Sequence, residues 1–435
     1  MNALSPEIAN QHTSMNPKSD GLYQRALSVL PDGTTRDSIF YKPYPVYAKR
    51  AIGSHIWDED GNERIDYCNS YTALILGHQN PDVKKAVEEQ LKNGTAFGQP
   101  TRFEVELAEK IVNMVPSVKR VKFTLSGSEA VMNAIRIARA YTGRDRIIMT
   151  EGAYHGSSDP VSVRGGATPS QGIPSATSAL TTVVKYNNIE DMQKAFHQDK
   201  EGIAAVILEP VQGAGGLFVP ARDYLKAVLE IAHEHDALVI FDEIITGFRL
   251  SRGGGQELFD VKPDLTTLGK IVAGGFPGAA VGGRRDLMDE VYGRKNGKPR
   301  LSLSGTHNAY PLAMVAGLAT LEQLTPELYD QINQTGASLK VGLSRLFEEN
   351  RVVGCVKGFK SLLNAYFGLV KVDGFKDAQS ADSNLRAAFD VLMLAKGVYL
   401  APLHLFCVSS ATSKDDIETT LRAADATLKW IKQES

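Results

Sequence analysis

Cysteine is scarce in this 435-residue chain, and long apolar runs are absent. The three cysteines, Cys68, Cys355 and Cys407, are widely separated, lack the spacing of metal ligands and are too few for a disulfide framework. Their scarcity predicts a reducing compartment. No apolar run approaches the roughly 20 residues needed to span a bilayer, so a transmembrane helix is not expected.

The sequence also lacks an excess of charge of either sign. Lysine and arginine total 48 and aspartate and glutamate total 50, which gives a formal net charge of −2. This balance, and the absence of a long basic run, argue against nucleic acid or a membrane surface as the main partner. A small-molecule substrate is the better expectation.

Targeting signals and two common phosphate-binding fingerprints are missing as well. Residues 1–20 have neither the apolar core of a signal peptide nor the arginines of a transit peptide, and we expect them to form a flexible tail on a cytoplasmic protein. The glycine clusters at 213–216 and 253–255 form neither a Walker loop nor a dinucleotide-binding motif. ATP and nicotinamide chemistry are therefore not indicated.

What the sequence does contain is a series of short, continuous apolar runs separated by stretches of helical periodicity. The runs lie at residues 120–125, 146–149, 204–208, 237–241, 265–268 and 279–282. Continuous apolarity is typical of strands that are buried on both faces. The pattern predicts an α/β fold in which helices cover a mainly parallel sheet, with binding residues at the carboxyl ends of the strands.

Lys270 and Asp242 each lie at the end of one of these runs, and glycines at 274 and 275 follow the lysine. A lysine that can form a Schiff base and a buried aspartate that can hold a pyridinium nitrogen are the two groups that a pyridoxal 5'-phosphate (PLP) enzyme most needs. The pair therefore predicts PLP chemistry, with Lys270 as the base that moves the substrate proton.

Two further motifs suit the same cofactor. Ser-Gly-Ser at 126–128 opens a helix with Ser128 as its candidate N-cap, and the N–H groups there would hold a phosphate, although most such triplets merely cap helices. Tyr154 and Ile244 could cover the two faces of a pyridine ring, with His155 behind them, or these residues could belong to an ordinary core.

Glu-Pro-Val-Gln-Gly at 209–213 and Gly-Thr at 305–306 complete the set. Gln212 could bind the phenolic oxygen of the cofactor. Glu209 could lie near the substrate entrance, or it could be structural. Thr306 is a candidate second phosphate ligand in what would otherwise pass for a loop.

Taken together, these motifs resemble, in order and spacing, the class III aminotransferases of PLP fold type I. The resemblance runs from about residue 25 to the C-terminus and looks strongest to the branch of glutamate-1-semialdehyde aminomutase and β-amino acid (β-phenylalanine) aminotransferase. It implies a seven-stranded, mainly parallel sheet in a large PLP-binding domain at 69–316. A smaller α+β domain is expected at 317–435, with an N-terminal segment at 21–68 packing against it.

The resemblance also implies the cofactor-binding residues and the assembly. Lys270 would be the Schiff-base lysine and Asp242 the partner of the pyridinium nitrogen. A homodimer is implied, in which Thr306 reaches the phosphate of the cofactor in the partner subunit. The implied cofactor-binding residues are Ser126, Gly127, Ser128, Tyr154, His155, Gln212, Asp242, Ile244, Lys270 and Thr306.

Arg36 is the predicted substrate-binding residue, together with Glu209. In the β-amino acid branch an arginine at the Arg36 position holds the substrate carboxylate, and its planar fork suits that bidentate pairing. The corresponding arginine of the aminomutase would fall at Ile39. Residues 70–73, Ser-Tyr-Thr-Ala, also favour the β-amino acid branch, because the aminomutase typically has a tryptophan near this position.

One segment departs from the pattern. In the β-phenylalanine enzymes an arginine near the Leu403 position recognises the second carboxylate of the keto acid, but this chain has no arginine between Arg386 and Arg422. His404 is the obvious polar side chain of that segment. The identity of the amino acceptor therefore stays open.

We expect an aminotransferase that moves an amino group between a β-amino acid, or a related amine, and a keto acid by a ping-pong mechanism. The alternatives are a glutamate-1-semialdehyde-type 2,1-aminomutase, and an amine or aldehyde transaminase in which Arg36 is idle. A non-catalytic relative is disfavoured because both Lys270 and Asp242 are retained. The loop at 157–182 is expected to cover the site.

Overall fold

The computed structural model describes residues 5–163, 171–199, 202–295, 297–402 and 405–434. The chain divides into two compact units. Unit 1 contains residues 1–80 and 330–435, and unit 2 contains residues 81–329. The boundaries expected from the sequence fell after residues 68 and 316, whereas the units divide after residues 80 and 329.

Unit 2 is built on a sheet that, within the described residues, has seven strands in the order β4-β10-β9-β8-β7-β5-β6. These strands are β4 (Arg120–Thr124), β5 (Arg146–Thr150), β6 (Thr181–Val184), β7 (Ile203–Leu208), β8 (Leu238–Glu243), β9 (Leu265–Leu268) and β10 (Ala279–Gly283). The pairings from β9 to β6 are parallel, and β10 runs antiparallel to both β4 and β9. The predicted seven-stranded, mainly parallel sheet is confirmed.

β6 is the strand of this sheet that the apolar runs did not predict. It forms the edge of the sheet in the described structure, pairs with β5, and contains Thr181 and Thr182. An edge strand is only partly covered, so it does not need a continuous apolar run. Residues 157–182, expected to be a covering loop, therefore lead into a strand, and residues 164–170 lie outside the described part.

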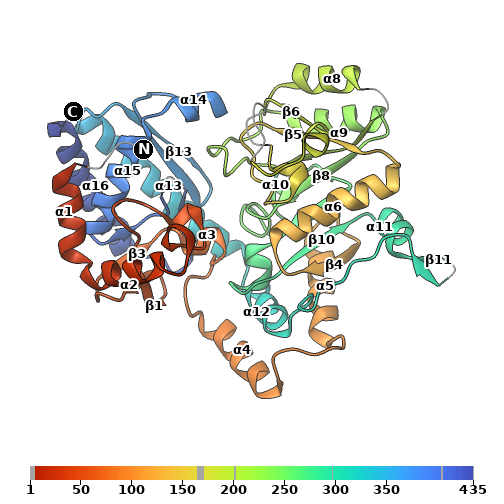
Figure 1. Cartoon of the computed structure of the whole chain (residues 1–435), viewed down its shortest axis with the longest axis horizontal. Helices are drawn as coiled ribbons and strands as arrows, with labels where there is room; N and C mark the ends of the chain where they lie inside the picture. Colours follow the sequence, from red (N-terminus) through yellow and green to blue (C-terminus); the bar gives the residue numbers. More distant parts are fainter. Residues whose placement is uncertain (1–4, 164–170, 200–201, 296, 403–404, 435) are drawn as a thin grey trace. The chain divides into compact units, whose positions relative to one another are not determined.

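Helices of unit 2 cover both faces of the sheet. Alternate strand residues pack on opposite sides: Ile147 and Ile240 contact α6 and α11, whereas Ile148 and Val239 contact α8 and α9. Figure 1 shows α8 and α9 together and α6 on the other side of the strands. The helices of this unit are α4 (Pro81–Asn93), α5 (Arg102–Met114), α6 (Gly127–Thr142), α7 (Ser175–Ser178), α8 (Ile189–Gln198), α9 (Tyr224–Glu234), α10 (Gly255–Leu258), α11 (Arg285–Tyr292) and α12 (Pro311–Glu322), and a short hairpin is formed by β11 (Arg294–Lys295) and β12 (Lys298–Pro299).

Unit 1 mixes helices with two smaller sheets. One sheet has the order β1-β2-β3-β15, from β1 (Ala48–Ile52), β2 (His55–Asp58), β3 (Glu63–Asp66) and β15 (Val398–Tyr399). The other has the order β13-β14-β16, from β13 (Gly354–Phe359), β14 (Leu362–Phe367) and β16 (Phe406–Cys407). β2 and β3 form an antiparallel hairpin, and β15 joins β3 in parallel, so the two ends of the chain share one sheet.

The described N-terminal residues are helical, so the prediction of a flexible tail at 1–20 is wrong for residues 5–20. Ile8 of α1 is 2% exposed and packs against Val391 and Leu392. The polar composition of the segment concealed this single apolar anchor. The helices of unit 1 are α1 (Pro6–Met15), α2 (Pro17–Leu27), α3 (Asn69–Thr72), α13 (Pro326–Glu349, which begins in unit 2), α14 (Phe375–Ser380), α15 (Ser383–Ala395) and α16 (Lys414–Glu434). Among the described helices none is long and apolar enough to cross a membrane.

Asp60 fixes the start of α2, because its carboxylate accepts hydrogen bonds from the N–H groups of Lys18 at 2.6 Å and Ser19 at 3.0 Å. We predict that Asp60→Ala destabilises this turn by about 1 kcal/mol, since both N–H groups lose their acceptor. Amide hydrogen exchange across residues 17–27 measures the effect. Glu59→Ala is the control, because Glu59 contacts the exposed Lys49 at 3.8 Å. Equal exchange rates in the two variants would contradict the prediction.

Candidate active site

Asp242 is the most firmly held side chain at the carboxyl edge of the sheet. It is 3% exposed and lies on β8. Its Oδ2 lies 2.7 Å from Nδ1 of His155, and its Oδ1 accepts hydrogen bonds from the hydroxyl of Thr267 and the N–H of Ile244, both at 3.1 Å. An ionised carboxylate only accepts, so the contact requires a proton on Nδ1 of His155. Asp242 is therefore oriented from three sides.

Lys270 emerges at the same edge. It begins the short 3-10 helix η5 (Lys270–Ala273), just beyond β9, and β9 pairs in parallel with β8. The φ angle of Lys270 is 52°, in the left-handed region that non-glycine residues seldom occupy. Such conformations gather at functional sites, where the surrounding structure enforces them.

The segment after Lys270 is locked against α12 by close backbone contacts. A Cβ on Gly274 would lie 2.4 Å from the carbonyl oxygen of Ala316, and one on Gly317 would lie 2.1 Å from the carbonyl oxygen of Val272. Gly274 also has a φ of 58°. Glycine at these positions lets η5 and α12 approach each other, and this contact fixes the turn that carries Lys270.

The N-terminus of α6 is the turn that the sequence predicts to bind phosphate, and its cap is Ser126. The Oγ of Ser126 accepts a hydrogen bond from the N–H of Glu129 at 3.3 Å. The prediction that Ser128 is the N-cap is wrong, because the helix already begins at Gly127. The Ser-x-x-Glu spacing at 126–129 was the available signal. The turn keeps the N–H direction and dipole that suit a phosphate.

Ile244 packs against two glycines of this edge. A Cβ on Gly127 would lie 3.1 Å from Cδ1 of Ile244, and one on Gly269 would lie 2.9 Å from the same atom. The side chain of Ile244 therefore lies between the turn at the start of α6 and the residue that precedes Lys270. This placement brings two predicted site residues, Gly127 and Ile244, beside the residue that precedes Lys270.

Gly156 allows the segment after β5 to pack closely against the turn at the start of α6. It has a φ of +93°, and a Cβ there would lie 2.5 Å from Oγ of Ser128. The same Oγ accepts a hydrogen bond from the N–H of Ser157 at 3.3 Å. Ser128 thus belongs to the turn without being its cap. Tyr154, on this segment, has a side chain that is 47% exposed.

Gln212 is fully buried, and the nitrogen and oxygen of its side-chain amide differ in their hydrogen bonding. Its Nε2 donates to the carbonyl oxygen of Glu151 at 2.5 Å, whereas its Oε1 is buried without a hydrogen-bond partner in the described structure. Buried polar atoms are rarely left unpaired in a functional protein. The amide oxygen is therefore suited to a group that a ligand brings.

Glu209 is also buried, at 3% exposed. Its carboxyl accepts hydrogen bonds from the backbone N–H groups of Tyr154 at 3.4 Å and Gly213 at 2.8 Å. The pKa of Glu209 is raised to about 7, mainly by burial, while His155 acts to lower it and Asp242 to raise it. These contacts favour the structural alternative for Glu209 over a direct substrate contact.

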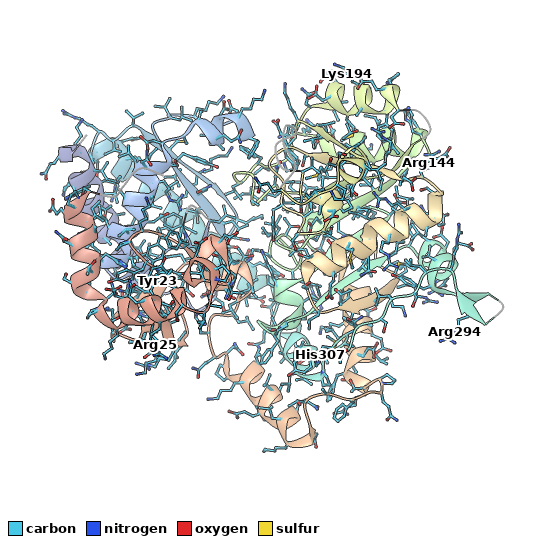
Figure 2. The ribbon with its side chains drawn as sticks, viewed as in Figure 1. Tyr23, Arg25, Arg144, Lys194, Arg294 and His307 are labelled. Carbon is cyan, nitrogen blue, oxygen red and sulfur yellow. The ribbon has the colours of Figure 1, made fainter. Side chains whose placement is uncertain are left out.

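Thr306 is exposed. With the rest of residues 305–311 it lines a hollow of about 470 Å³, which residues 96–100 and Glu104 complete. His307, labelled in Figure 2, follows it in the same loop. Within one chain, the described structure records no contact of Thr306 with the start of α6.

Arg36 belongs to unit 1, where it is exposed and directly precedes the 3-10 helix η2 (Asp37–Ile39). Its charge acts to lower the pKa of Tyr71, which burial raises. This effect on Tyr71 shows that Arg36 lies beside the 70–73 segment. All four residues of α3, which include Tyr71, have positive φ angles, of 45°, 51°, 57° and 74°. Leu403 and His404, in the other segment that bears on substrate choice, lie outside the described residues.

Thr267 is the site residue that the sequence analysis missed. It lies on β9, is fully buried, and donates to Asp242. Threonine is common in strands, so its identity carries no signal by itself. The pairing of Thr267 with Asp242 in the register of β8 and β9 is what gives it a role.

Comparisons with known proteins show the family of the chain. The family profile of "Aminotransferase class-III" matches residues 39–422. A glutamate-1-semialdehyde 2,1-aminomutase from Methanothrix thermoacetophila is 42% identical over 94% of this chain and 96% of its own length.

Two solved structures are similarly close. An omega-transaminase from Sphaerobacter thermophilus is 37% identical, with a TM-score of 0.90, covering 94% of this chain and 97% of its own. A β-phenylalanine aminotransferase from Variovorax paradoxus is 31% identical, with a TM-score of 0.89, covering 98% of this chain and 97% of its own. The higher identity to the aminomutase favours the alternative named in the sequence analysis over the β-amino acid transaminase.

Gly156→Ala tests the phosphate-binding turn. We predict at least about a tenfold loss of PLP affinity, equivalent to about 1.4 kcal/mol, because the new methyl group meets Oγ of Ser128 and displaces the turn. Spectrophotometric titration with PLP measures it. Gly172→Ala is the matched control, since Gly172 has a φ of +90° with nothing within 4 Å. Similar affinities in the two variants would show that strain at positive φ, and not the contact with Ser128, is responsible.

Proposed function

The chain belongs to the class III aminotransferase family, and from this premise we propose that it moves an amino group on a small, carboxylate-bearing substrate. It is an enzyme, and it uses PLP. The arrangement of Lys270, Asp242 and His155 at one edge of the sheet is the observation that supports the proposal most directly.

The residues present fit PLP. The start of α6, with Gly127 and Ser128, would hold the phosphate, Asp242 would hold the ring nitrogen, and Lys270 would hold the aldehyde carbon. The buried amide oxygen of Gln212 is available to a polar group of the ligand. When bound, PLP supplies an electron sink for the negative charge that develops at the substrate carbon.

The protein's own groups then have defined tasks. Asp242, oriented by His155 and Thr267, would favour the protonated form of the cofactor's ring nitrogen through its negative charge. The Nζ of Lys270 is the base that takes up and returns a proton at the substrate carbon. Ile244 presents an apolar surface between the phosphate-binding turn and Gly269, which keeps water from that side.

A 2,1-aminomutase reaction is the first candidate activity. It is supported by the glutamate-1-semialdehyde 2,1-aminomutases that are 38–42% identical over nearly the whole chain. Such a reaction moves the amino group within one molecule and needs no keto-acid acceptor. The absence of an arginine between Arg386 and Arg422 is then expected, since no second carboxylate has to be recognised.

A β-amino acid transaminase is the second candidate. It is supported by Arg36, which lies where that branch holds the substrate carboxylate, and by Ile39, which stands where the aminomutase has its arginine. The solved omega-transaminase and β-phenylalanine aminotransferase, at 37% and 31% identity, add to this support. Glu209 is not required as a substrate contact in either candidate.

We also propose a homodimer in the cytoplasm, with Thr306 reaching the phosphate of the partner subunit's cofactor. The support is the exposure of residues 304–307 together with the hollow that residues 305–311 line. An exposed polar loop beside such a hollow is suited to a second protein surface.

Turnover in the absence of a keto-acid acceptor distinguishes the 2,1-aminomutase from the β-amino acid transaminase. We predict that the PLP- or pyridoxamine-phosphate-loaded protein converts glutamate-1-semialdehyde into its 2,1-isomer with no keto acid present. Lys270→Ala should lose about 10²–10⁴-fold in rate, as expected for loss of the base. Chromatography of the products measures both. Turnover of β-amino acids that strictly requires an added keto acid would instead establish the transaminase.

Arg36→Ala tests the carboxylate contact in either reaction. We predict that KM for carboxylate substrates rises about 10- to 100-fold, because a charged hydrogen bond of about 1.5–3 kcal/mol is lost, while amines without a carboxylate are unaffected. Arg25→Ala is the matched control, since Arg25 (Figure 2) is an exposed arginine at the end of α2. An unchanged KM for carboxylates would leave Arg36 without this role.

A further inference from the structure

Two buried carboxyl groups leave the sheet side by side. Leu208 of β7 pairs in parallel register with Phe241 of β8, so the residues that follow them, Glu209 and Asp242, come next to each other at the carboxyl edge. Each is 3% exposed. Two adjacent carboxylates that are both buried repel each other and are poorly solvated, so a state with both ionised is disfavoured.

The order of the strands determines what surrounds Glu209. β7 lies between β8 and β5 in the sheet, and the hydrogen bond between Asp242 and His155 joins the ends of these two outer strands. Glu209, at the end of the middle strand, is therefore close to both members of that pair. Its charge state acts on them directly.

The partners of the two carboxyl groups differ. Asp242 receives hydrogen bonds from the side chains of His155 and Thr267, which suit a carboxylate. Glu209 is held by two backbone N–H groups, the nearer being that of Gly213 at 2.8 Å. Within the described ranges no lysine or arginine forms an ion pair with Glu209. Of the two groups, Glu209 is the one better suited to keeping a proton.

The titratable groups around Glu209 support this assignment. The pKa of Glu209 is raised to about 7, mainly by burial, with His155 acting to lower it and Asp242 to raise it. Tyr186, beyond β6, also faces it. Burial raises the pKa of Tyr186 well above its ordinary value, and its hydroxyl donates to the carbonyl oxygen of Pro210 at 2.8 Å, so it stays neutral.

His155 is placed to respond to a change at Glu209. Its Nδ1 lies 2.7 Å from Asp242, and its Nε2 is buried without a hydrogen-bond partner among the described residues. Glu243, the next carboxyl along β8, is directed elsewhere and accepts hydrogen bonds from the N–H groups of Gly255 and Gln256. A negative charge on Glu209 would therefore act on the imidazole that Asp242 contacts.

We propose that Glu209 is a positioning residue that keeps its proton in mildly acidic solution and so leaves Asp242 as the single negative charge shared by His155 and the ring nitrogen of PLP. When Glu209 loses its proton at higher pH, a second negative charge lies beside His155, and Asp242 is no longer the only carboxylate that acts on the ring nitrogen. The part that concerns PLP rests on the proposed function, whereas the proton on Glu209 does not.

Infrared difference spectra of the cofactor-free protein test the proton itself, because a protonated carboxyl has a C=O stretch that a carboxylate lacks. In the spectrum of the native protein minus Glu209→Gln, we expect this band at pH 6 and its loss as the pH rises through about 7. Glu88→Gln, which changes a side chain that is 58% exposed, should show no such band at pH 6, since an exposed glutamate is ionised there. Absence of the band at pH 6 from the Glu209 difference overturns the proposal.

Two further measurements complete the test. If Glu209→Gln fails to fold, the native protein can be studied with its glutamates labelled with ¹³C. The label must then shift the frequency of a protonated-carboxyl band, and that band must disappear as the pH rises through about 7. In the cofactor-loaded protein, Glu209→Gln must move the pH profile of the cofactor absorbance, whereas a purely structural role would lower occupancy and leave that profile unchanged. A native protein without a cofactor band would reject the proposed function, and the infrared result would still stand.

Discussion

The hydrogen bond between Nδ1 of His155 and Oδ2 of Asp242 is the contact on which the candidate site depends. It joins residues that are 87 positions apart and connects the ends of β5 and β8 across β7. Both side chains are buried, so water does not compete for the bond, and an uncompensated charge in this place would be strongly destabilising. The bond orients Asp242 and brings the carboxyl of Glu209 against the same pair.

Close packing between backbone segments positions Lys270, the second main residue of the candidate site. Gly274 and Gly317 allow η5 to lie directly against α12, and Gly127 and Gly269 leave the space that Ile244 fills. Because protein interiors are packed nearly as densely as crystals, such contacts permit little displacement. The unusual backbone angle of Lys270 is thereby maintained, and the lysine is held at the same edge as Asp242.

The choice between the two candidate reactions illustrates how local and global similarity can differ. Identity over the whole chain favours an aminomutase, whereas Arg36 and Ile39 match the pattern of β-amino acid transaminases. Whole-chain identity is dominated by the residues that build the sheet and the cofactor site, which both reactions share. The proposed substrate contact, Arg36 beside Tyr71, involves few side chains, and these contribute little to an overall identity.

The sequence by itself determined the sheet and the cofactor, and it predicted roles for Lys270 and Asp242, because a buried parallel strand and the residue at its end are both local features of the chain. It did not reveal the edge strand β6, the anchor at Ile8 or the role of Thr267. It also left open whether His155 and Glu209 belonged to the site or to the core. Strand order and register give β6 and Thr267 their places and bring His155 and Glu209 beside Asp242, whereas the anchor at Ile8 depends on the packing of α1 against α15; both kinds of contact join residues that are distant in the sequence.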